Sequence, residues 1–200
     1  MVFDIFGFSP STLQGADILA YSNEADPYLV IVPDFFDGTP AEPSWFAPTA
    51  TPSDKSKIET FFKDRAAPSL ALVRFPGIVK ETTESRGIRE WGALGLCWGG
   101  KPVSIASAAE RSLGWKAAAQ VHPSMLDPED AKAINIPFAL LASADEDKEA
   151  VERFGANLMA DKLLETFDDM SHGWMGARLV ISAKDPRTQV LKLISIIEPT

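Results

Sequence analysis

The chain has 200 residues, of which 46% are hydrophobic and 24% are charged, a composition typical of one soluble globular domain. That composition argues against a disordered chain, and no apolar run approaches the ~18 residues that would span a bilayer. The net charge of −9 repels phosphate backbones and disfavours nucleic acid as the main partner.

The counts of cysteine and histidine are low. Cys97 is the only cysteine, and the two histidines are His122 and His172. These counts exclude an internal disulfide and a multi-cysteine zinc site, and they disfavour a histidine-rich metal site. No basic segment leads into an apolar one at the start, as it would in a secretory signal. We therefore expect a cytoplasmic protein with one domain over residues 1–200 and with no metal, no cofactor and no membrane association.

Short apolar runs alternate with helix-like segments along the chain. The predicted strands lie at residues 28–32, 93–96, 117–121 and 137–142, and a further one begins at residue 166. The predicted helices lie at residues 12–22, 53–63, 103–113, 148–164 and 187–197; residues 70–75 form a run too short to assign. Strands that alternate with helices pair in parallel, so the sequence predicts a three-layer α/β fold with a mostly parallel central sheet.

A proline-rich segment at residues 38–53 interrupts this alternation. Proline prevents regular hydrogen-bonded ladders, so this segment is predicted to be a long surface loop or lid. Trp45 and Phe46 in its middle are apolar and predict that it packs against the body of the domain.

The most informative motif is Gly-Leu-Cys-Trp-Gly-Gly at residues 95–100. It has the form of a nucleophile elbow, in which a nucleophile occupies a sharp turn between a strand and a helix. Such a turn strains the backbone, and Gly95 and Gly99 remove the side chains that would collide. The N-terminus of the following helix favours the thiolate form of Cys97. The alternative is a buried, inert cysteine in a glycine-rich turn.

A cysteine nucleophile of this kind needs a histidine as its base. His172 lies in the loop Ser-His-Gly-Trp at residues 171–174, after a predicted strand, and is the preferred candidate. His122 lies between a predicted strand and Pro123, and we expect it to be a structural residue satisfied by the backbone.

An orienting carboxylate is expected between the nucleophile and the base, after the strand at residues 137–142. Asp145, Glu146 and Asp147 follow that strand within a few residues. Asp145 is nearest to the strand end and is the candidate, with Asp147 as the alternative. Either aspartate could instead cap the helix predicted from residue 148.

Five segments together resemble the dienelactone hydrolase family, and its fungal branch most closely. They are Asp-Ile-Phe-Gly at residues 4–7, Pro-Asp-Phe-Phe-Asp-Gly at 33–38, Gly-Leu-Cys-Trp-Gly-Gly-Lys at 95–101, His-Pro-Ser at 122–124 and Ser-His-Gly-Trp at 171–174. The resemblance covers nearly the whole chain in the family's order. It implies an α/β-hydrolase fold that cleaves esters and lactones, with Cys97 as nucleophile, His172 as base and Asp145 as orienting acid.

The resemblance also implies an oxyanion hole formed by the backbone N–H groups of Ile5 and Trp98. In bacterial members an acidic residue in the place of Asp4 helps to hold the resting thiol. Asp4 is shorter than the glutamate of the bacterial archetype, and the alternative is a solvated loop carboxylate.

The side chains expected to bind substrate are Asp4, Phe36, Trp174 and Arg178. The arginines that bind the substrate carboxylate in the bacterial enzyme have no secure counterpart here. Arg178 and Arg74 are the candidates, and an exposed surface arginine is the alternative for each.

Family members usually carry further strands before the Asp-Ile-Phe-Gly loop, on which this chain almost begins. We therefore expect a sheet shortened at its N-terminal strands, or an open edge covered by a partner chain, as in a homodimer. The expected activity is hydrolysis of a small ester, lactone or thioester through an acyl-cysteine. The alternative is a catalytically weak protein of this fold that binds a small ligand or a partner.

Overall fold

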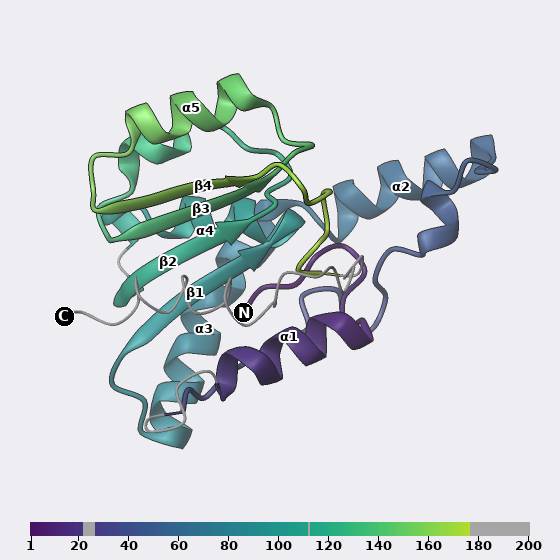
Figure 1. The fold of residues 1–200 in the computed structure, drawn as a ribbon. Helices are drawn as coiled ribbons and strands as arrows, with labels where there is room; N and C mark the ends of the chain where they lie inside the picture. The colour runs from purple at the N-terminus through teal and green to yellow at the C-terminus, as the bar shows by residue number, and fades with distance from the viewer. Residues whose placement is uncertain (22–26, 112, 177–200) are drawn as a thin grey trace.

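A parallel four-stranded sheet forms the centre of the molecule, which the computed structural model describes for residues 1–21, 27–111 and 113–176 (Figure 1). The strands lie in the order β1 (Trp91–Leu96), β2 (Trp115–Val121), β3 (Phe138–Ser143) and β4 (Lys162–Phe167). Each strand is paired in parallel with the next in sequence, as the alternation of strands and helices predicts.

Five α-helices and four 3₁₀ turns accompany these strands in the described part of the chain. The helices are α1 (Pro10–Ala20), α2 (Pro52–Asp64), α3 (Pro68–Arg86), α4 (Gly100–Ala106) and α5 (Lys148–Asn157). The 3₁₀ turns are η1 (Pro43–Phe46), η2 (Cys97–Gly99), η3 (Ala109–Arg111) and η4 (Asp130–Ala133). None of these described helices is long and apolar enough to cross a membrane.

The sheet is buried on both faces, which makes the fold three-layered. Alternate residues of each central strand enter different apolar clusters: Leu140 joins one cluster and Leu141 the other. The first cluster includes Phe75 of α3, Val103 of α4 and Phe154 of α5. On the opposite face, Leu19 of α1 packs against the second cluster. The predicted three-layer α/β architecture is therefore confirmed.

Two predicted elements have different limits in the structure. The helix predicted at residues 148–164 ends at Asn157, because Leu158 is extended and Lys162 Nζ donates to the Gly155 and Leu158 carbonyls at 2.6 and 2.8 Å. The residues that follow form β4. The helix predicted at residues 103–113 is α4, which ends at Ala106 and is followed by η3.

Two other segments were assigned by the structure, and a third lies outside the described residues. Residues 28–32 are not a strand, although the Met1 amino group donates to the Ile31 carbonyl at 2.6 Å. Residues 70–75, left open by the sequence, belong to α3. The helix predicted at residues 187–197 lies outside the described residues.

Candidate active site

The turn between β1 and α4 holds Cys97 in a conformation that the two flanking glycines permit. Cys97 has a φ of +52°, in the left-handed region that non-glycine residues seldom occupy. A Cβ atom on Gly95 would overlap the Gly99 carbonyl, and one on Gly99 would lie 2.5 Å from the Val2 carbonyl oxygen. Both glycines are therefore required for the close backbone approach that the motif predicts.

The N-terminal segment lies directly beside this turn. The Val2 N–H donates to Leu94 O at 2.7 Å, and the Leu96 N–H donates to Val2 O at 2.9 Å. The chain then enters the turn around Ile5, where Asp4 Oδ1 accepts from the Phe6 N–H at 2.8 Å. The two segments expected to supply oxyanion donors, at Ile5 and Trp98, are thus neighbours in the fold.

His172 is the histidine that meets Cys97. Its Nε2 atom lies 3.2 Å from Cys97 Sγ, although 75 residues separate the two in sequence. The ring is carried by the loop after β4, where Gly173 has a φ of +92° and Trp174 N–H donates to Ser171 O. The contact is within hydrogen-bonding distance for a sulfur atom.

The carboxylate against the other ring nitrogen belongs to Glu146 and not to Asp145. Glu146 Oε1 lies 2.7 Å from His172 Nδ1, and its second oxygen accepts from the Ser143 N–H. Its side chain is only 5% exposed. The prediction of Asp145 at this position is corrected, because the shorter aspartate accepts instead from the backbone N–H of His172, at 2.7 Å.

Asp147, the alternative acid, also has a different partner. Its Oδ1 atom accepts from the Glu149 N–H at 3.0 Å and caps α5. Sequence reasoning missed Glu146 because proximity to the strand end favoured Asp145. The signal that could have found it is the run of three acids, in which only Glu146 has the extra methylene group.

The surroundings of His172 favour its charged form. Burial by itself lowers the pKa of His172, but the hydrogen bonds and charges of Cys97 and Glu146 outweigh burial and raise it to about 10. These contacts therefore stabilise the imidazolium form of His172.

His122 lies behind His172, with ring centroids 5.1 Å apart. Its side chain is fully buried, and neither ring nitrogen has a hydrogen-bond partner in the described part of the chain. The main-chain N–H of His122 donates to Leu141 O at 2.7 Å. Burial, followed by the charge of His172, lowers the pKa of His122 to about 3, so its ring is neutral near pH 7.

The side chains expected to bind substrate are mostly packed inside the protein. Phe36 is 1% exposed and packs on Trp98 at 4.8 Å, so its ring lies in the core and its contact with substrate stays a prediction. Trp174 is 3% exposed and packs on Phe167 at 5.0 Å, so its ring is also in the core, and its contact with substrate stays a prediction too. In both cases the apolar ring area is better buried in the core than presented to a ligand.

The charged candidates have separate outcomes. Asp4 is 2% exposed, so the alternative of a solvated loop carboxylate is wrong. A Cβ atom on Gly176 would lie 2.6 Å from Asp4 Oδ2, which places this carboxylate under the segment after His172. Arg74 Nη1 lies 3.2 Å from Asp37 Oδ1, and its exposed side chain forms a surface ion pair. Arg178 lies outside the described residues.

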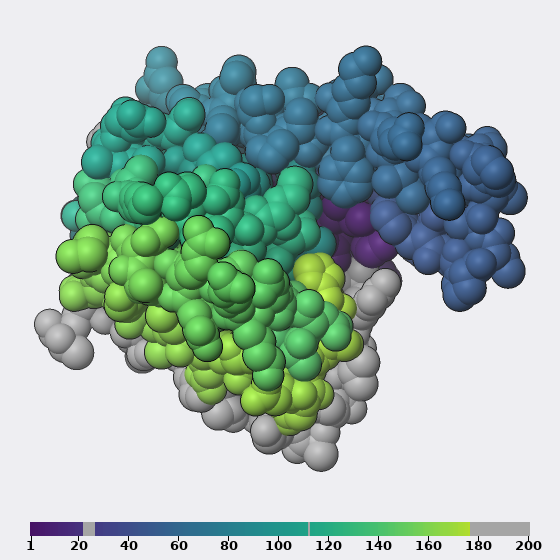
Figure 2. Space-filling view, turned by 90° about the horizontal axis from the view of Figure 1, so that it is seen from above, coloured from purple at the N-terminus to yellow at the C-terminus, as the bar shows by residue number. Residues whose placement is uncertain are grey.

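A groove of about 1240 Å³ is lined in part by Phe6, the residue that follows Ile5. Its walls come from the turn at Phe6, the proline-rich segment with η1, and α2. Figure 2 shows a notch in the surface, with the N-terminal residues (purple) at its base. The residues of η1 and α2 (blue) form the part of the surface beside this notch. Neither Cys97 nor His172 lines the groove itself. Among the residues that the structure describes, no cluster of three His, Cys, Asp or Glu side chains is arranged to hold a metal ion.

Comparisons of the sequence with known proteins identify related chains. The family model described as the dienelactone hydrolase family matches residues 1–177. An uncharacterized AIM2 family protein of Schizosaccharomyces pombe is 36% identical over 190 residues, covering 92% of this chain and 73% of the relative. The hydrolase pyvD of Aspergillus violaceofuscus is 28% identical over 181 residues, covering 86% of this chain and 66% of that protein.

Solved structures show the same fold. The dienelactone hydrolase from Anabaena variabilis superposes with a TM-score of 0.60, covering 98% of this chain and 83% of that chain. Its sequence identity of 17% is low, so this likeness supports the fold alone. The structural comparison thus confirms the predicted α/β-hydrolase architecture.

Proposed function

Because the chain belongs to the dienelactone hydrolase family, a family of hydrolases, we propose that it cleaves a small ester, lactone or thioester through an acyl-cysteine on Cys97. The observation that carries this proposal is the contact of 3.2 Å between Cys97 Sγ and His172 Nε2, with Glu146 at 2.7 Å from the opposite ring nitrogen. A nucleophile, a base and an orienting carboxylate in line are the arrangement that acyl transfer requires.

The first half-reaction forms the acyl-cysteine. The Cys97 thiolate attacks the carbonyl carbon and forms a C–S bond, while the carbonyl oxygen takes up negative charge. The N–H groups of Ile5 and Trp98 are the proposed donors to this oxyanion. As the tetrahedral intermediate collapses, the bond to the leaving group breaks and His172 gives its proton to that group.

The second half-reaction releases the acid. His172, now neutral, takes a proton from water as the oxygen of that water attacks the thioester carbon. The C–S bond then breaks, and the electron pair returns to the Cys97 sulfur, which regenerates the ion pair with His172. Thiolate is a good leaving group, so activated esters and lactones suit this site better than amides.

The two carboxylates next to His172 have different proposed roles. Glu146 orients the ring and stabilises its positive charge through Nδ1. Asp145 positions the loop by accepting from the His172 backbone N–H. The assignment of the orienting acid thereby moves from Asp145 to Glu146, a change of one residue that keeps the order nucleophile, acid, base along the chain.

Hydrolysis of a chromogenic short-chain ester tests this proposal. We expect turnover by the natural sequence and its loss in both Cys97→Ala and His172→Ala, with circular dichroism showing that the fold is intact. Tyr21→Ala is the control, since this exposed side chain on the C-cap of α1 should leave turnover unchanged. Turnover that persists in Cys97→Ala would contradict the proposal. No turnover of any ester, together with tight retention of a ligand, would favour the alternative of a binding protein.

A further inference from the structure

The groove beside the candidate site has an aromatic wall. Phe6, Trp45 and Phe61 all line it, and Trp45 and Phe61 are in ring contact at 6.2 Å. Phe6 is supported from behind by Phe46, whose ring lies edge-on at 5.7 Å. Aromatic surfaces that face an open groove are suited to bind a flat apolar group, because its burial removes apolar area from water.

The groove is joined to the proposed oxyanion turn by direct contacts. Ala41, which lines the groove, donates its N–H to the Ile5 carbonyl at 2.9 Å. Phe6 follows Ile5 and lines the groove as well. The groove therefore begins one residue from a proposed donor to the substrate carbonyl oxygen, although the catalytic side chains lie outside it.

We propose that this groove binds the acyl portion of the substrate, and that the protein prefers acyl groups carrying a large aromatic ring. This inference rests on the proposed hydrolase function and specifies its substrate class. The groove volume of about 1240 Å³ exceeds the range of roughly 300–1000 Å³ that is common for small-molecule pockets. A short acyl chain such as acetyl would leave most of that space to water.

The direction of proton transfer decides which part of the substrate enters the groove. The leaving group must face His172, because His172 Nε2 donates the proton that releases it. The acyl substituent on the same carbonyl carbon then points away from His172. Among the described residues that follow β4, 168–176, none lines the groove, whereas Phe6 of the oxyanion turn does, so the acyl side is the side that meets the groove.

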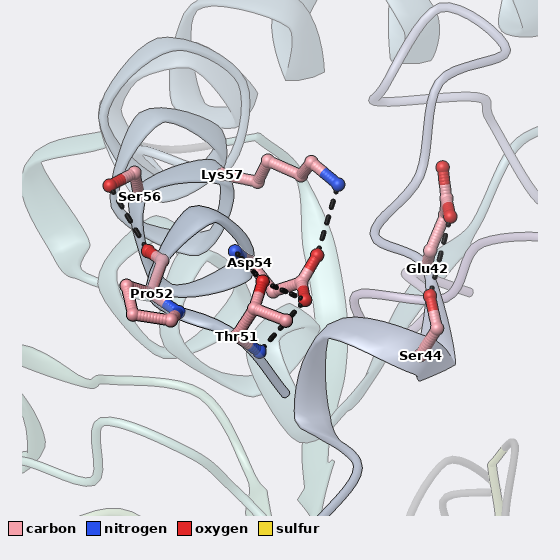
Figure 3. A network of polar contacts seen from close by, with 7 residues as sticks. All are labelled: Glu42, Ser44, Thr51, Pro52, Asp54, Ser56 and Lys57. Carbon is pink, nitrogen blue, oxygen red and sulfur yellow. Dashed lines mark hydrogen bonds and ion pairs between the residues drawn. The ribbon is translucent and has the colours of Figure 1, made fainter. Parts of the chain in front are cut away.

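The far rim of the groove is held in place by a hydrogen-bonded network (Figure 3). Thr51 and Asp54 form a reciprocal cap at the start of α2, and Lys57 Nζ lies 3.0 Å from Asp54 Oδ1. The Lys57 ammonium also lies 5.9 Å from the centre of the Trp45 ring. These contacts fix the helix against which the Trp45 ring packs and support a defined aromatic wall.

Trp45 offers one polar atom besides its apolar surface. Its indole Nε1–H is buried and has no acceptor in the described residues. A buried donor without an acceptor is costly, so a water or an acceptor atom of the ligand is expected to meet it. An acyl group with an ether or carbonyl oxygen near its ring would place the ring on the apolar surface of Trp45 and the oxygen at its Nε1–H.

The test compares two esters that share a leaving group and have similar carbonyl reactivity: 4-nitrophenyl propanoate and 4-nitrophenyl 3-(2-naphthyl)propanoate. For the natural sequence we expect kcat/KM to be at least roughly tenfold higher for the naphthyl ester, from burial of its ring. In Trp45→Ala this ratio should fall by about tenfold, since the largest ring of the aromatic wall is lost. Trp45→Phe keeps a ring and should retain more than half of the preference.

The control is Tyr21→Ala, which removes an exposed aromatic ring outside the groove and should leave the ratio unchanged. A natural sequence that hydrolyses both esters without preferring the naphthyl ester would overturn the assignment of the groove while leaving the hydrolase function intact. An unchanged ratio in Trp45→Ala would overturn it too. If neither ester is hydrolysed and neither acylates Cys97, the proposed function fails, and the assignment that rests on it fails with it.

Discussion

Three consecutive acidic residues after β3 each have a different partner. Asp145 binds a backbone N–H, Glu146 binds the ring of His172, and Asp147 caps α5. Only the glutamate reaches the ring, and its second oxygen is held by the Ser143 N–H. Because both oxygens of Glu146 accept hydrogen bonds, this side chain has little freedom to turn away from the imidazole.

The first prediction separates these carboxylates. Glu146→Gln should lower kcat/KM for a small ester by roughly 10²-fold or more, since an amide carries no charge and offers only one acceptor oxygen for two donors. Asp145→Asn keeps an acceptor for the His172 N–H and should lower kcat/KM by no more than about tenfold. Steady-state kinetics of both variants would check this, with circular dichroism as the control for folding. A larger loss in Asp145→Asn than in Glu146→Gln would restore Asp145 as the orienting acid.

A second prediction concerns the pH dependence of stability and rests on His122. Its folded pKa of about 3 is depressed below the ordinary value of 6.5, so between these values the unfolded state binds a proton that the folded state does not. The free energy of unfolding should therefore fall as the pH drops from 6.5 towards 3, by up to about 1.4 kcal/mol per pH unit. The raised pKa of His172 acts in a separate window: its stabilising contribution is complete below pH 6.5 and is lost as the pH rises to about 10.

Urea unfolding of His122→Asn and of the natural sequence at several pH values from 4.5 to 7 would measure this difference. Asparagine tolerates the positive φ of 37° at this position and does not titrate. The variant should show the smaller slope of stability against pH below 6.5. Parallel slopes would show that His122 is not held neutral in the folded protein.

At the scale of elements, the elbow depends on the N-terminal segment as much as on its own glycines. The Val2 and Phe3 carbonyl oxygens lie 2.5 and 2.8 Å from the place of a Cβ on Gly99. These are main-chain atoms, and Val2 O also accepts from the Leu96 N–H of β1, so they cannot move aside as a flexible side chain could. Any side chain at position 99 must therefore push the oxyanion turn away from Cys97.

Gly99→Ala should accordingly destabilise the protein by about 1–3 kcal/mol, the usual cost of overpacking. Gly77→Ala is the matched control, because no atom lies within 4 Å of the added methyl group in α3. Alanine is the better helix former, so this variant should be more stable by about 0.5–1 kcal/mol. Chemical denaturation of the two variants measures both effects, and equal stabilities would refute the steric argument.

The elements predicted correctly are those whose local sequence pattern favours the same structure as their packing in the fold. The elbow followed from the glycine spacing around Cys97, and the parallel sheet followed from the alternation of apolar runs. The apolar run at residues 28–32 resembles a strand but pairs with none, because strand pairing depends on distant chain segments. The extra methylene group of Glu146 is a weak sequence signal, since which carboxylate reaches the ring depends on where β3 ends and how the loop turns.

At the scale of the whole molecule, η1 and α2 form a lobe that stands out from the sheet (Figure 1). The central strands β2 and β3 are almost fully buried, whereas α2 buries only Phe61. Because the lobe is much less buried than the sheet, we predict that the lobe opens locally without unfolding the sheet. A lobe of this kind would allow the groove to adjust to acyl groups of different size.

Native-state hydrogen exchange would measure this opening residue by residue. We expect the amides of α2 to exchange with an opening free energy at least about 2 kcal/mol lower than those of β2 and β3. Saturation with a slowly hydrolysed naphthyl ester should raise the protection of α2 more than that of the sheet. If α2 and the sheet exchange at the same free energy, the lobe and the sheet unfold as one unit.

The central claim is that Cys97, paired with His172, becomes acylated. The most direct test is mass spectrometry after rapid mixing with an activated ester and quenching in acid, followed by peptide mapping. We predict an added acyl mass on the peptide that contains Cys97, formed far more slowly in His172→Ala and absent in Cys97→Ala. Hydrolysis of the ester with no acyl mass on Cys97 at any time, or acylation of another residue in its place, would contradict the account.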